Sequence, residues 1–236
     1  MSAAIPKPDT NRLIAGLPSK EGERLLRLCE PVELLFGTVL CEINEPMENA
    51  YFPVTALISL VKPTKSHQPL GVAMIGNEGV LGATLALGIS TPRLRGVVHG
   101  SGAGLRLSAP QLLQLLDDSP GLQSALMRYA YVLMGQLLQT ATCNSFHEVE
   151  MRLARWLLMS NDRVDSELLP LTHQFLADTL GVQRSAVTIA AGKLQRKKLI
   201  DYSRGRISIL SLRGLEDASC ECYRMQVNDH AQQFAV

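Results

Sequence analysis

The sequence predicts an α+β protein that begins with a β-barrel of the jelly-roll kind, continues as one long helix and ends in a winged helix-turn-helix. Short apolar runs between Gly, Pro and charged residues predict the barrel, because such runs are typical of antiparallel sandwiches and barrels. A leucine-rich stretch from Leu122 predicts the long helix, and two short amphipathic stretches that meet at Gly181 predict the helix pair. We expect three parts, residues 1–118, 119–146 and 147–236.

Length and composition set the broad class. With 236 residues, 46% of them hydrophobic, the chain can bury a sizeable core. The net charge is only +1, so any basic surface must be local. The chain has no apolar run of about 18 residues and no N-terminal signal pattern, which predicts a cytoplasmic protein without a membrane segment. Its five cysteines have no framework spacing and fit reduced thiols.

The first part reads as helices followed by strands. Residues 11–29 suggest two short helices around Pro18. Between Pro31 and Ser108, the runs VELLFGTVLCE, AYFPVTALISLV, LGVAMIG, RGVVHG and GLRLS recur with turn signals between them. This spacing predicts the barrel strands.

A glycine-rich turn interrupts the strand pattern. Gly76, Glu78 and Gly79 precede a short helical piece, and two arginines follow, Arg93 and Arg95. Backbone N–H groups at such a turn, with arginines nearby, can bind an anion. We therefore predict these five as candidate effector-binding residues. The alternative is that the glycines only let strands turn corners.

The long helix starts after Ser119-Pro120-Gly121, a good helix start. Its apolar positions spread around more than one face, so we expect it to pack both on the barrel and on a second subunit. The predicted dimerisation residues are Leu122, Leu126, Tyr129, Leu133 and Leu137. The alternative is packing on the barrel alone. The helix should pause around His147, which we expect to be a cap or hinge residue at the domain boundary.

Two short helices are predicted between Leu171 and Ile200. Thr172 is a good N-cap, and Gly181 suits the left-handed end of the first helix. The second helix should begin near Gln183 and end near Gln195. Its expected buried stripe is Val187, Ala190, Ala191 and Leu194.

The opposite face of this second helix predicts a polyanionic partner. Between Arg184 and Arg206, seven Lys or Arg residues stand against Asp201 alone. The segment LIDYSRGRISIL then reads as a hairpin with two arginines at its tip, which predicts a wing that reaches the phosphate backbone. The candidate DNA contacts are Thr172, Gln183, Arg184, Ser185, Thr188, Ile189, Lys193, Arg196, Arg204 and Arg206.

The tail from Leu212 reads as one final helix that contains the only close cysteine pair, Cys220 and Cys222. This CEC pair lacks the two-residue gap of common zinc knuckles and has no second pair downstream. We therefore expect no metal site and place the pair on the helix surface. Cys29, Cys41 and Cys143 are isolated and are expected to be small buried hydrophobic residues.

In this order, the barrel, glycine-rich turn, long helix and winged helix resemble the Crp/Fnr superfamily of bacterial transcription regulators. The resemblance spans about Asn11 to Tyr223, and it is most specific in LTHQFLADTLGVQRSAVTIAAGKLQRKKLI followed by YSRGRISIL. It implies a cyclic-nucleotide-binding-like barrel, a homodimer, RNA polymerase as a further partner, and an effector or redox centre that changes the packing of the long helices.

The resemblance also assigns roles to single positions. Arg184 stands where the family places an arginine that pairs with guanine, whereas Ser185 and Ile189 depart from the catabolite activator pattern. The turn Gly76-Asn77-Glu78-Gly79 is one residue longer than the cyclic-nucleotide motif, and the serine and alanine after the family's arginine are missing. We therefore expect neither a bound cyclic nucleotide nor, without an N-terminal cysteine cluster, an iron-sulfur cofactor.

These observations predict a homodimeric, sequence-specific regulator that binds near-palindromic double-stranded DNA and responds to an unidentified signal at the barrel, for which a small-molecule effector is the candidate. The alternative is a ligand-binding sensor module whose C-terminal helices contact protein instead of DNA. We do not expect an enzyme, because the HExxH, GxSxG and lysine-bearing phosphate-loop motifs are missing from the sequence.

Overall fold

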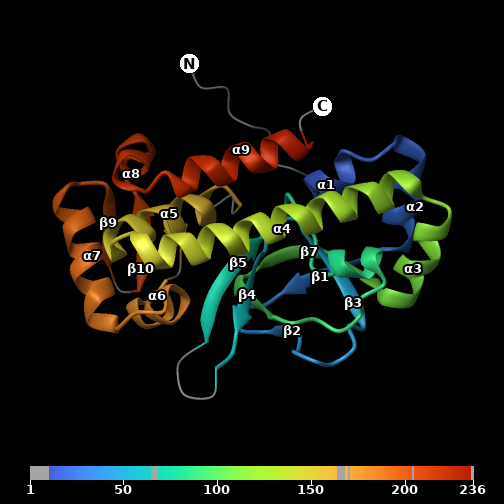
Figure 1. Ribbon diagram of the computed structural model, residues 1–236, viewed down its shortest axis with the longest axis horizontal. Coiled ribbons are helices and arrows are strands. Elements are labelled where there is room, and N and C mark those ends of the chain that lie inside the picture. Colours follow the sequence, from blue (N-terminus) through green and yellow to red (C-terminus); the bar gives the residue numbers. More distant parts are fainter. Residues whose placement is uncertain (1–10, 65–68, 164–167, 170, 204, 235–236) are drawn as a thin grey trace.

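Two facing antiparallel sheets form the N-terminal part of the computed structural model, which describes residues 11–64, 69–163, 168–169, 171–203 and 205–234. One sheet has the order β1-β7-β3 and the other β2-β6-β4-β5. The strands are β1 Glu30–Leu34, β2 Val39–Cys41, β3 Asn49–Pro53, β4 Leu57–Lys62, β5 Leu70–Ile75, β6 Arg95–Gly100 and β7 Gly102–Ser108. This layered arrangement confirms the predicted α+β class and barrel (Figure 1).

Short helices accompany the barrel strands. Helices α1 (Arg12–Ala15) and α2 (Ser19–Leu28) precede it, the 3-10 helix η1 (Ala83–Leu87) follows the glycine-rich turn, and α3 (Ala109–Asp117) follows β7. The barrel core is built from fully buried side chains of both sheets and of the helices that cover them. Examples are Phe52, Ile58, Ile75, Leu107 and Leu112.

Helix α4, Pro120–Phe146, is the long predicted helix, and its 27 residues span about 40 Å. The carboxylate of Glu21 accepts hydrogen bonds from the backbone N–H groups of Gly121 and Leu122 and so caps the first turn. The helix ends with His147 in the C-cap position, which confirms the predicted cap. In Figure 1, α4 runs along most of the molecule and joins the barrel to the C-terminal helices.

The face of α4 that was predicted to dimerise packs instead on the barrel of its own protomer. Leu122, Leu126 and Tyr129 are fully buried there, and Leu133 and Leu137 pack partly against the same core. The leucine spacing correctly marks an apolar face, but spacing alone does not say which surface covers that face. Leu122, Leu126 and Tyr129 are therefore part of the protomer core, and Leu133 and Leu137 border it.

A second apolar face of α4 points outward. The side chains of Met127, Tyr131, Met134 and Leu138 are 46%, 59%, 49% and 64% exposed. They follow one another at steps of four, three and four residues, which places them on one side of a helix. We call these four residues the outer stripe of α4.

The C-terminal part is a winged helix with its own core. It contains α5 (Val149–Asn161), α6 (His173–Leu180), α7 (Arg184–Arg196), α8 (Leu212–Ala218) and a small sheet of order β8-β10-β9, made of Leu168–Leu169, Arg206–Ile209 and Ile200–Ser203. Leu153, Leu176, Val187, Leu194 and Ile207 form its fully buried centre.

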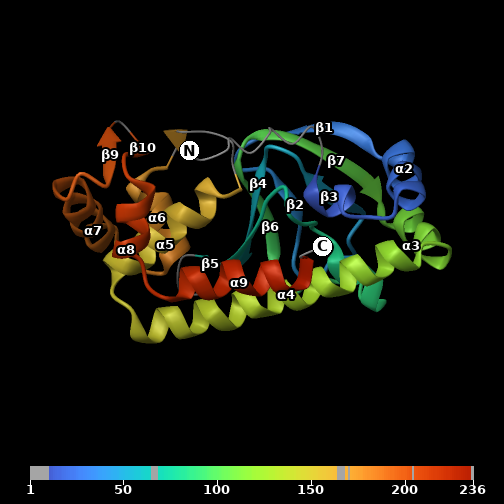
Figure 2. The same cartoon turned by 90° about the horizontal axis from the view of Figure 1, so that it is seen from above.

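The tail is two helices rather than one. Helix α8 ends at Ala218, the chain turns through Ser219 to Glu221, and α9 then runs from Cys222 to Phe234 beside α4 (Figure 2). Cys220 and Cys222 are buried at this turn, so their predicted place on a helix surface is wrong. Within the described ranges, no helix has both the length and the apolar character needed to cross a membrane.

Candidate nucleic-acid interface

The two predicted helices form the helix-turn-helix at one end of the molecule. The hydroxyl of Thr172 accepts a hydrogen bond of 3.1 Å from the backbone N–H of Phe175 and caps α6. Gly181 ends α6 with φ at 63°, a left-handed conformation that a side chain would strain. Helix α7 then begins at Arg184, with Gln183 as its N-cap residue.

One face of α7 is buried and the other is open. Val187, Ala190, Ala191 and Leu194 contact the domain core, as the spacing predicts. The opposite face leaves Gln183, Arg184, Ser185, Thr188, Ile189 and Arg196 exposed. Ile189 is 62% exposed, which is costly for an isolated surface but suits contact with an apolar group such as a thymine methyl. The open face therefore has the mixed chemistry that base edges require.

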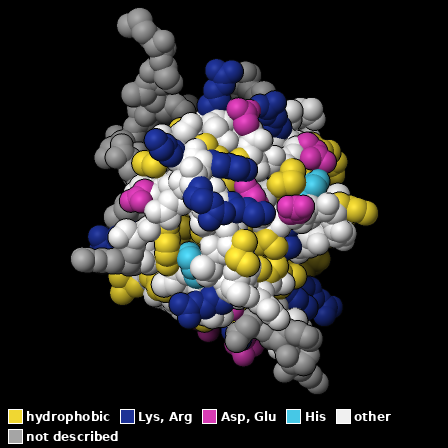
Figure 3. Space-filling view, turned by 90° about the vertical axis from the view of Figure 1, so that its left-hand side faces the viewer, with side chains coloured by type: hydrophobic (Ala, Val, Ile, Leu, Met, Phe, Trp, Pro, Cys, Tyr) yellow, Lys and Arg dark blue, Asp and Glu magenta, His cyan; other side chains and the backbone are white. Residues whose placement is uncertain are grey.

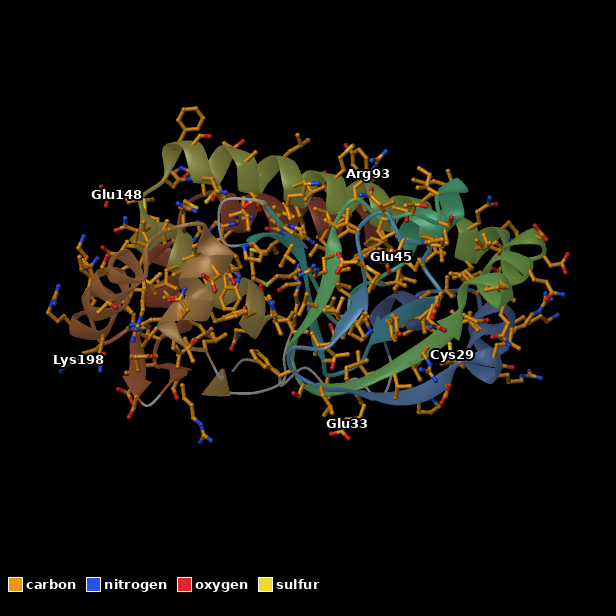
Figure 4. The ribbon with its side chains drawn as sticks, turned by 90° about the horizontal axis from the view of Figure 1, so that it is seen from below. Cys29, Glu33, Glu45, Arg93, Glu148 and Lys198 are labelled. Carbon is orange, nitrogen blue, oxygen red and sulfur yellow. The ribbon has the colours of Figure 1, made fainter. Side chains whose placement is uncertain are left out.

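Some of the Lys and Arg side chains near α7 and the wing are free to bind an anionic partner, and others are held in ion pairs. Arg184, Arg196, Lys198 and Arg206 are exposed and have no ion-pair partner among the described residues. Lys and Arg side chains gather on the end that faces the viewer in Figure 3, and Figure 4 shows Lys198 pointing outward at that end. These four side chains are free to meet phosphate oxygens.

Lys193 and Lys197 are held by an acidic side chain of α5. Their ammonium groups lie 3.4 Å and 2.6 Å from the carboxylate oxygens of Glu150. The hydrogen bond from Lys197, followed by that from Lys193, holds the pKa of Glu150 below its ordinary value. The prediction that Lys193 contacts DNA thus overlooked an acidic residue that lies far away in the sequence.

Replacing Glu150 by Gln should strengthen binding to random DNA. The amide removes the counter-charge of Lys193 and Lys197, so both ammonium groups can displace cations from phosphates. Titrations at several salt concentrations should show a steeper dependence of log affinity on log salt, by up to about 2. Glu148→Gln changes the net charge equally at an exposed neighbouring position and serves as the control. Equal effects of the two variants would show that Glu150 does not restrain the lysines.

The first residue of α6 was missing from the predicted contacts. The ring of His173 stacks on that of Tyr202 with centroids 4.1 Å apart, and its Nδ1 lies 2.9 Å from the hydroxyl oxygen of Thr188. Burial, followed by the charge of Arg184, lowers the pKa of His173, which keeps the ring neutral near pH 7. His173 thus connects the wing to the open face of α7. Its position next to an N-cap residue gave no sequence signal for this role.

The wing is a tight hairpin. Strands β9 and β10 pair with Ser203 opposite Arg206, so a two-residue turn joins them. Gly205 in that turn has φ at 77°, which favours glycine. Arg206 is exposed beside the turn, whereas the predicted contact Arg204 lies outside the described residues. The structure thus places one of the two predicted wing arginines at the tip.

The predicted effector residues fall into two separate groups. Arg93 is exposed beside α4 (Figure 4) and lines a cavity of about 780 Å³ between the barrel and α4. Arg95 is held by Glu42, with Nε 2.8 Å from the carboxylate. The other cavity walls are mostly apolar, and they include Met47, Leu60 and Ile75. Arg93 is thus the predicted residue that the structure leaves available to a ligand.

The glycine-rich turn does not face this cavity; it packs against α4 and α5. Gly76, Glu78 and Gly79 are buried, and the carboxylate of Glu78 receives a 2.9 Å ion pair from Nε of Arg163. A Cβ atom on Gly79 would overlap the ring of Tyr129. In this arrangement the turn leaves no open cradle for an anion, because all three residues are buried and the carboxylate of Glu78 is paired with Arg163.

A second contact joins the barrel directly to the helix-turn-helix. Gly71 of β5 lies against Thr179 of α6, and a Cβ on Gly71 would stand 2.8 Å from the methyl carbon of that threonine. Leu70 in the same strand lies over Gly181. We call this contact the β5–α6 seam.

Comparisons with known proteins agree with this geometry. Residues 151–218 match the Crp-like helix-turn-helix domain. The chain is 27% identical over 180 residues to the global nitrogen regulator of Nostoc sp., and the match covers 70% of this chain and 78% of that protein.

Solved structures share the whole arrangement. The c-di-GMP responsive global regulator CLP of Xanthomonas campestris matches with a TM-score of 0.66 at 17% identity, over 82% of this chain and 100% of that one. FixK2 from Bradyrhizobium japonicum matches with 0.66 at 14% identity, over 81% and 98% of the two chains. A CRP family transcriptional regulator from Thermus thermophilus matches with 0.65 at 18% identity, over 80% and 96%. At these identities the likeness shows a common fold.

Proposed function

We propose that the chain is a DNA-binding transcription regulator of the Crp/Fnr superfamily and that it acts as a homodimer on near-palindromic operators. The observation that carries this proposal is the open face of α7, where Arg184, Ser185, Thr188 and Ile189 are all exposed on one helix. Each subunit would set this face into a major groove, with half-sites about 34–36 Å apart. The free cations Arg196, Lys198 and Arg206 would contact the flanking phosphates, and RNA polymerase would be the further partner at a promoter.

The outer stripe of α4 supports the dimer. Four large apolar side chains in a row on a surface helix expose area that a second copy of the same helix can cover. A symmetric dimer about α4 would present two copies of α7 to one duplex. We therefore propose that the outer stripe of α4 forms the dimer contact, in place of the leucine face that packs on the barrel.

The cavity beside Arg93 supports control by a small molecule. Its apolar walls favour an apolar body, and the guanidinium of Arg93 favours an acidic group at the rim. Because Glu78 is paired with Arg163, it is not available to a ribose. We therefore propose an acidic, largely apolar effector rather than a cyclic nucleotide.

Replacing Arg184 by Ala should relax the preference at one base pair of each half-site. A bidentate arginine–guanine contact contributes about 1–3 kcal/mol of discrimination. Arg196→Ala, in contrast, should weaken operator and random DNA alike, because a phosphate contact carries no sequence information. Selection of bound sequences from random DNA, followed by titration of the enriched site, measures both effects.

The same selection tests the proposed function. An enriched two-fold symmetric motif supports it. Failure to retain any DNA at low salt would contradict it and favour the alternative, a sensor module that acts through protein contacts.

A further inference from the structure

Four potential metal ligands meet where the end of α4 touches the start of α9. They are Cys143, His147, Cys220 and Cys222, and their ligand atoms all lie within 4.8 Å of one another. The Sγ atoms of Cys143 and Cys220 are 3.5 Å apart, and Sγ of Cys222 is 3.4 Å from Nδ1 of His147. All three thiols are free and buried. Nothing in the DNA-binding function uses this cluster.

Local structure explains why these residues converge. Cys143 lies in the last turn of α4, and His147 is the cap residue four positions later, so both are on the same side of the helix end. Cys220 lies in the turn after α8, and Cys222 opens α9. The break between α8 and α9 thus brings the CEC pair onto the end of α4.

We propose that Cys143, His147, Cys220 and Cys222 bind one Zn²⁺ in a closed tetrahedral site. Zinc bonds of about 2.3 Å to sulfur and about 2.0 Å to nitrogen require ligand atoms roughly 3.5–3.8 Å apart. The two measured separations are within a few tenths of an ångström of this range. Thiolates with an imidazole in tetrahedral geometry favour zinc among the common metals. Four protein ligands leave no open position, so the ion would be structural.

The surrounding charges fit an anionic site. Zinc with three thiolates carries one net negative charge. Arg152 and Arg155 are buried near the thiols, and in the described parts of the chain neither has a carboxylate partner. A buried cation needs a compensating anion, and the metal–thiolate group would supply it. A zinc ion bound to the three thiolates would therefore supply the negative charge that balances the buried arginines.

His147 is also oriented as a ligand. Its Nε2 lies 3.2 Å from a carboxylate oxygen of Glu221, which leaves Nδ1 for the metal. Metal-bound histidines usually donate their second N–H to such a group, which fixes the ring. Glu221 is therefore a positioning residue rather than a ligand.

Two other uses of four such residues fit less well. An iron-sulfur cluster places several atoms between its ligands, whereas the four ligand atoms here are close enough to share one ion. A disulfide between Cys143 and Cys220 would use two of the thiols and leave Cys222 and His147 without a role. Both outcomes can be recognised in the test.

The test measures metal in the full chain, purified without chelators and then reconstituted with ZnCl2. Elemental analysis should give one zinc per chain, and titration with a chromogenic chelator gives the affinity. Replacement of Zn²⁺ by Co²⁺ should produce the visible absorption of tetrahedral thiolate-bound cobalt. Adding zinc should also raise the melting temperature of the metal-free chain, since the ion binds the folded state.

His147 is the least buried of the four ligands, so its variants carry the smallest risk of misfolding. Glu221→Gln removes a positioning residue and should weaken zinc binding by about 10–100-fold. His147→Ala removes a ligand and should weaken zinc binding by more than this. His147→Cys restores four ligands and should restore binding. Cys41→Ser removes a buried barrel thiol and is the matched control.

Four results would overturn the site. The first is a zinc content of the unmodified chain no higher than that of His147→Ala, and the second is an equal loss of zinc binding in Cys41→Ser and Cys222→Ser. The third is the absorption spectrum of an iron-sulfur cluster, and the fourth is a Cys143–Cys220 disulfide in the freshly purified chain. None of these results depends on whether the chain binds DNA.

Discussion

Replacing Arg163 by Met should lower the free energy of unfolding by about 3–5 kcal/mol, because it leaves a buried carboxylate without its cation. The side chains of Arg163 and Glu78 are only 9% and 3% exposed, and their ion pair joins the end of α5 to the barrel. The hydroxyl of Tyr129 lies 3.5 Å from the same carboxylate. Urea denaturation of the two proteins at neutral pH measures the difference.

The pH dependence of stability should change sign in this variant. Burial by itself would raise the pKa of Glu78, but the charge of Arg163 and several hydrogen bonds outweigh it and hold the pKa below its ordinary value of 4.5. The native pair therefore stabilises the fold above about pH 4.5, and this contribution is lost as the pH falls. Without Arg163, burial raises the pKa, so the stability of the variant should fall as the pH rises through this region.

The control for this experiment is an arginine of the barrel itself. Arg95 pairs with Glu42 at 2.8 Å, but both side chains are about one-third exposed. Arg95→Met should therefore cost less than about 1 kcal/mol. A double variant that replaces both Glu78 and Arg163 by Met should recover much of the loss, because it leaves no unpaired charge. If Arg163→Met and Arg95→Met lowered the free energy of unfolding by similar amounts, the buried ion pair would contribute no more to stability than the partly exposed one.

Placing glutamates at Tyr131 and Leu138 should convert the proposed dimer into monomers and lower operator affinity by about 10²–10⁴-fold. These residues are 59% and 64% exposed and lie two turns apart on the outer stripe of α4. Across a symmetric contact each new charge meets its own copy, and the loss of a linked second half-site removes the gain from bivalent binding. Sedimentation gives the mass, and titration of a full and a half operator gives the affinities.

A matched variant tests whether the loss of the dimer depends on where the glutamates are placed or follows from any replacement of exposed apolar residues by charged ones. Leu26 and Leu113 are 41% and 43% exposed on α2 and α3, far from the outer stripe. Glutamates at these two positions should leave the mass and the operator affinity unchanged. If the α4 variant stays dimeric, another surface must join the two copies.

The helical spacing of apolar residues, together with the cap residues, was sufficient to predict the helix-turn-helix. The cap at Thr172, the left-handed Gly181 and the buried stripe of α7 are all local properties, and the structure confirms each of them. The open face of α7 followed from the same helical spacing. What periodicity could not give was the pairing of Lys193 and Lys197 with Glu150, since that carboxylate comes from another helix.

Apart from the break between α8 and α9, the errors concern contacts between distant segments. The leucine face of α4 was recognised, but the spacing did not reveal that the barrel of the same protomer fully covers Leu122, Leu126 and Tyr129. Gly76 and Gly79 were noticed for their lack of side chains, yet they make room for Arg163 and Tyr129 rather than for an anion. The CEC pair seemed incomplete because its two further companions, Cys143 and His147, are more than seventy residues earlier.

The β5–α6 seam has a consequence for the proposed effector. Since Gly71 and Leu70 are packed against α6, any movement that re-aims α7 must first open that contact and expose it to water. A compound that binds the closed and the opened arrangement equally well has no effect, however tightly it binds. Turning a population of 1:99 into 99:1 takes a preference of about 10⁴-fold for one arrangement. The potency of the proposed effector would therefore be a ratio of two affinities, and screens that score binding alone would select the wrong compounds.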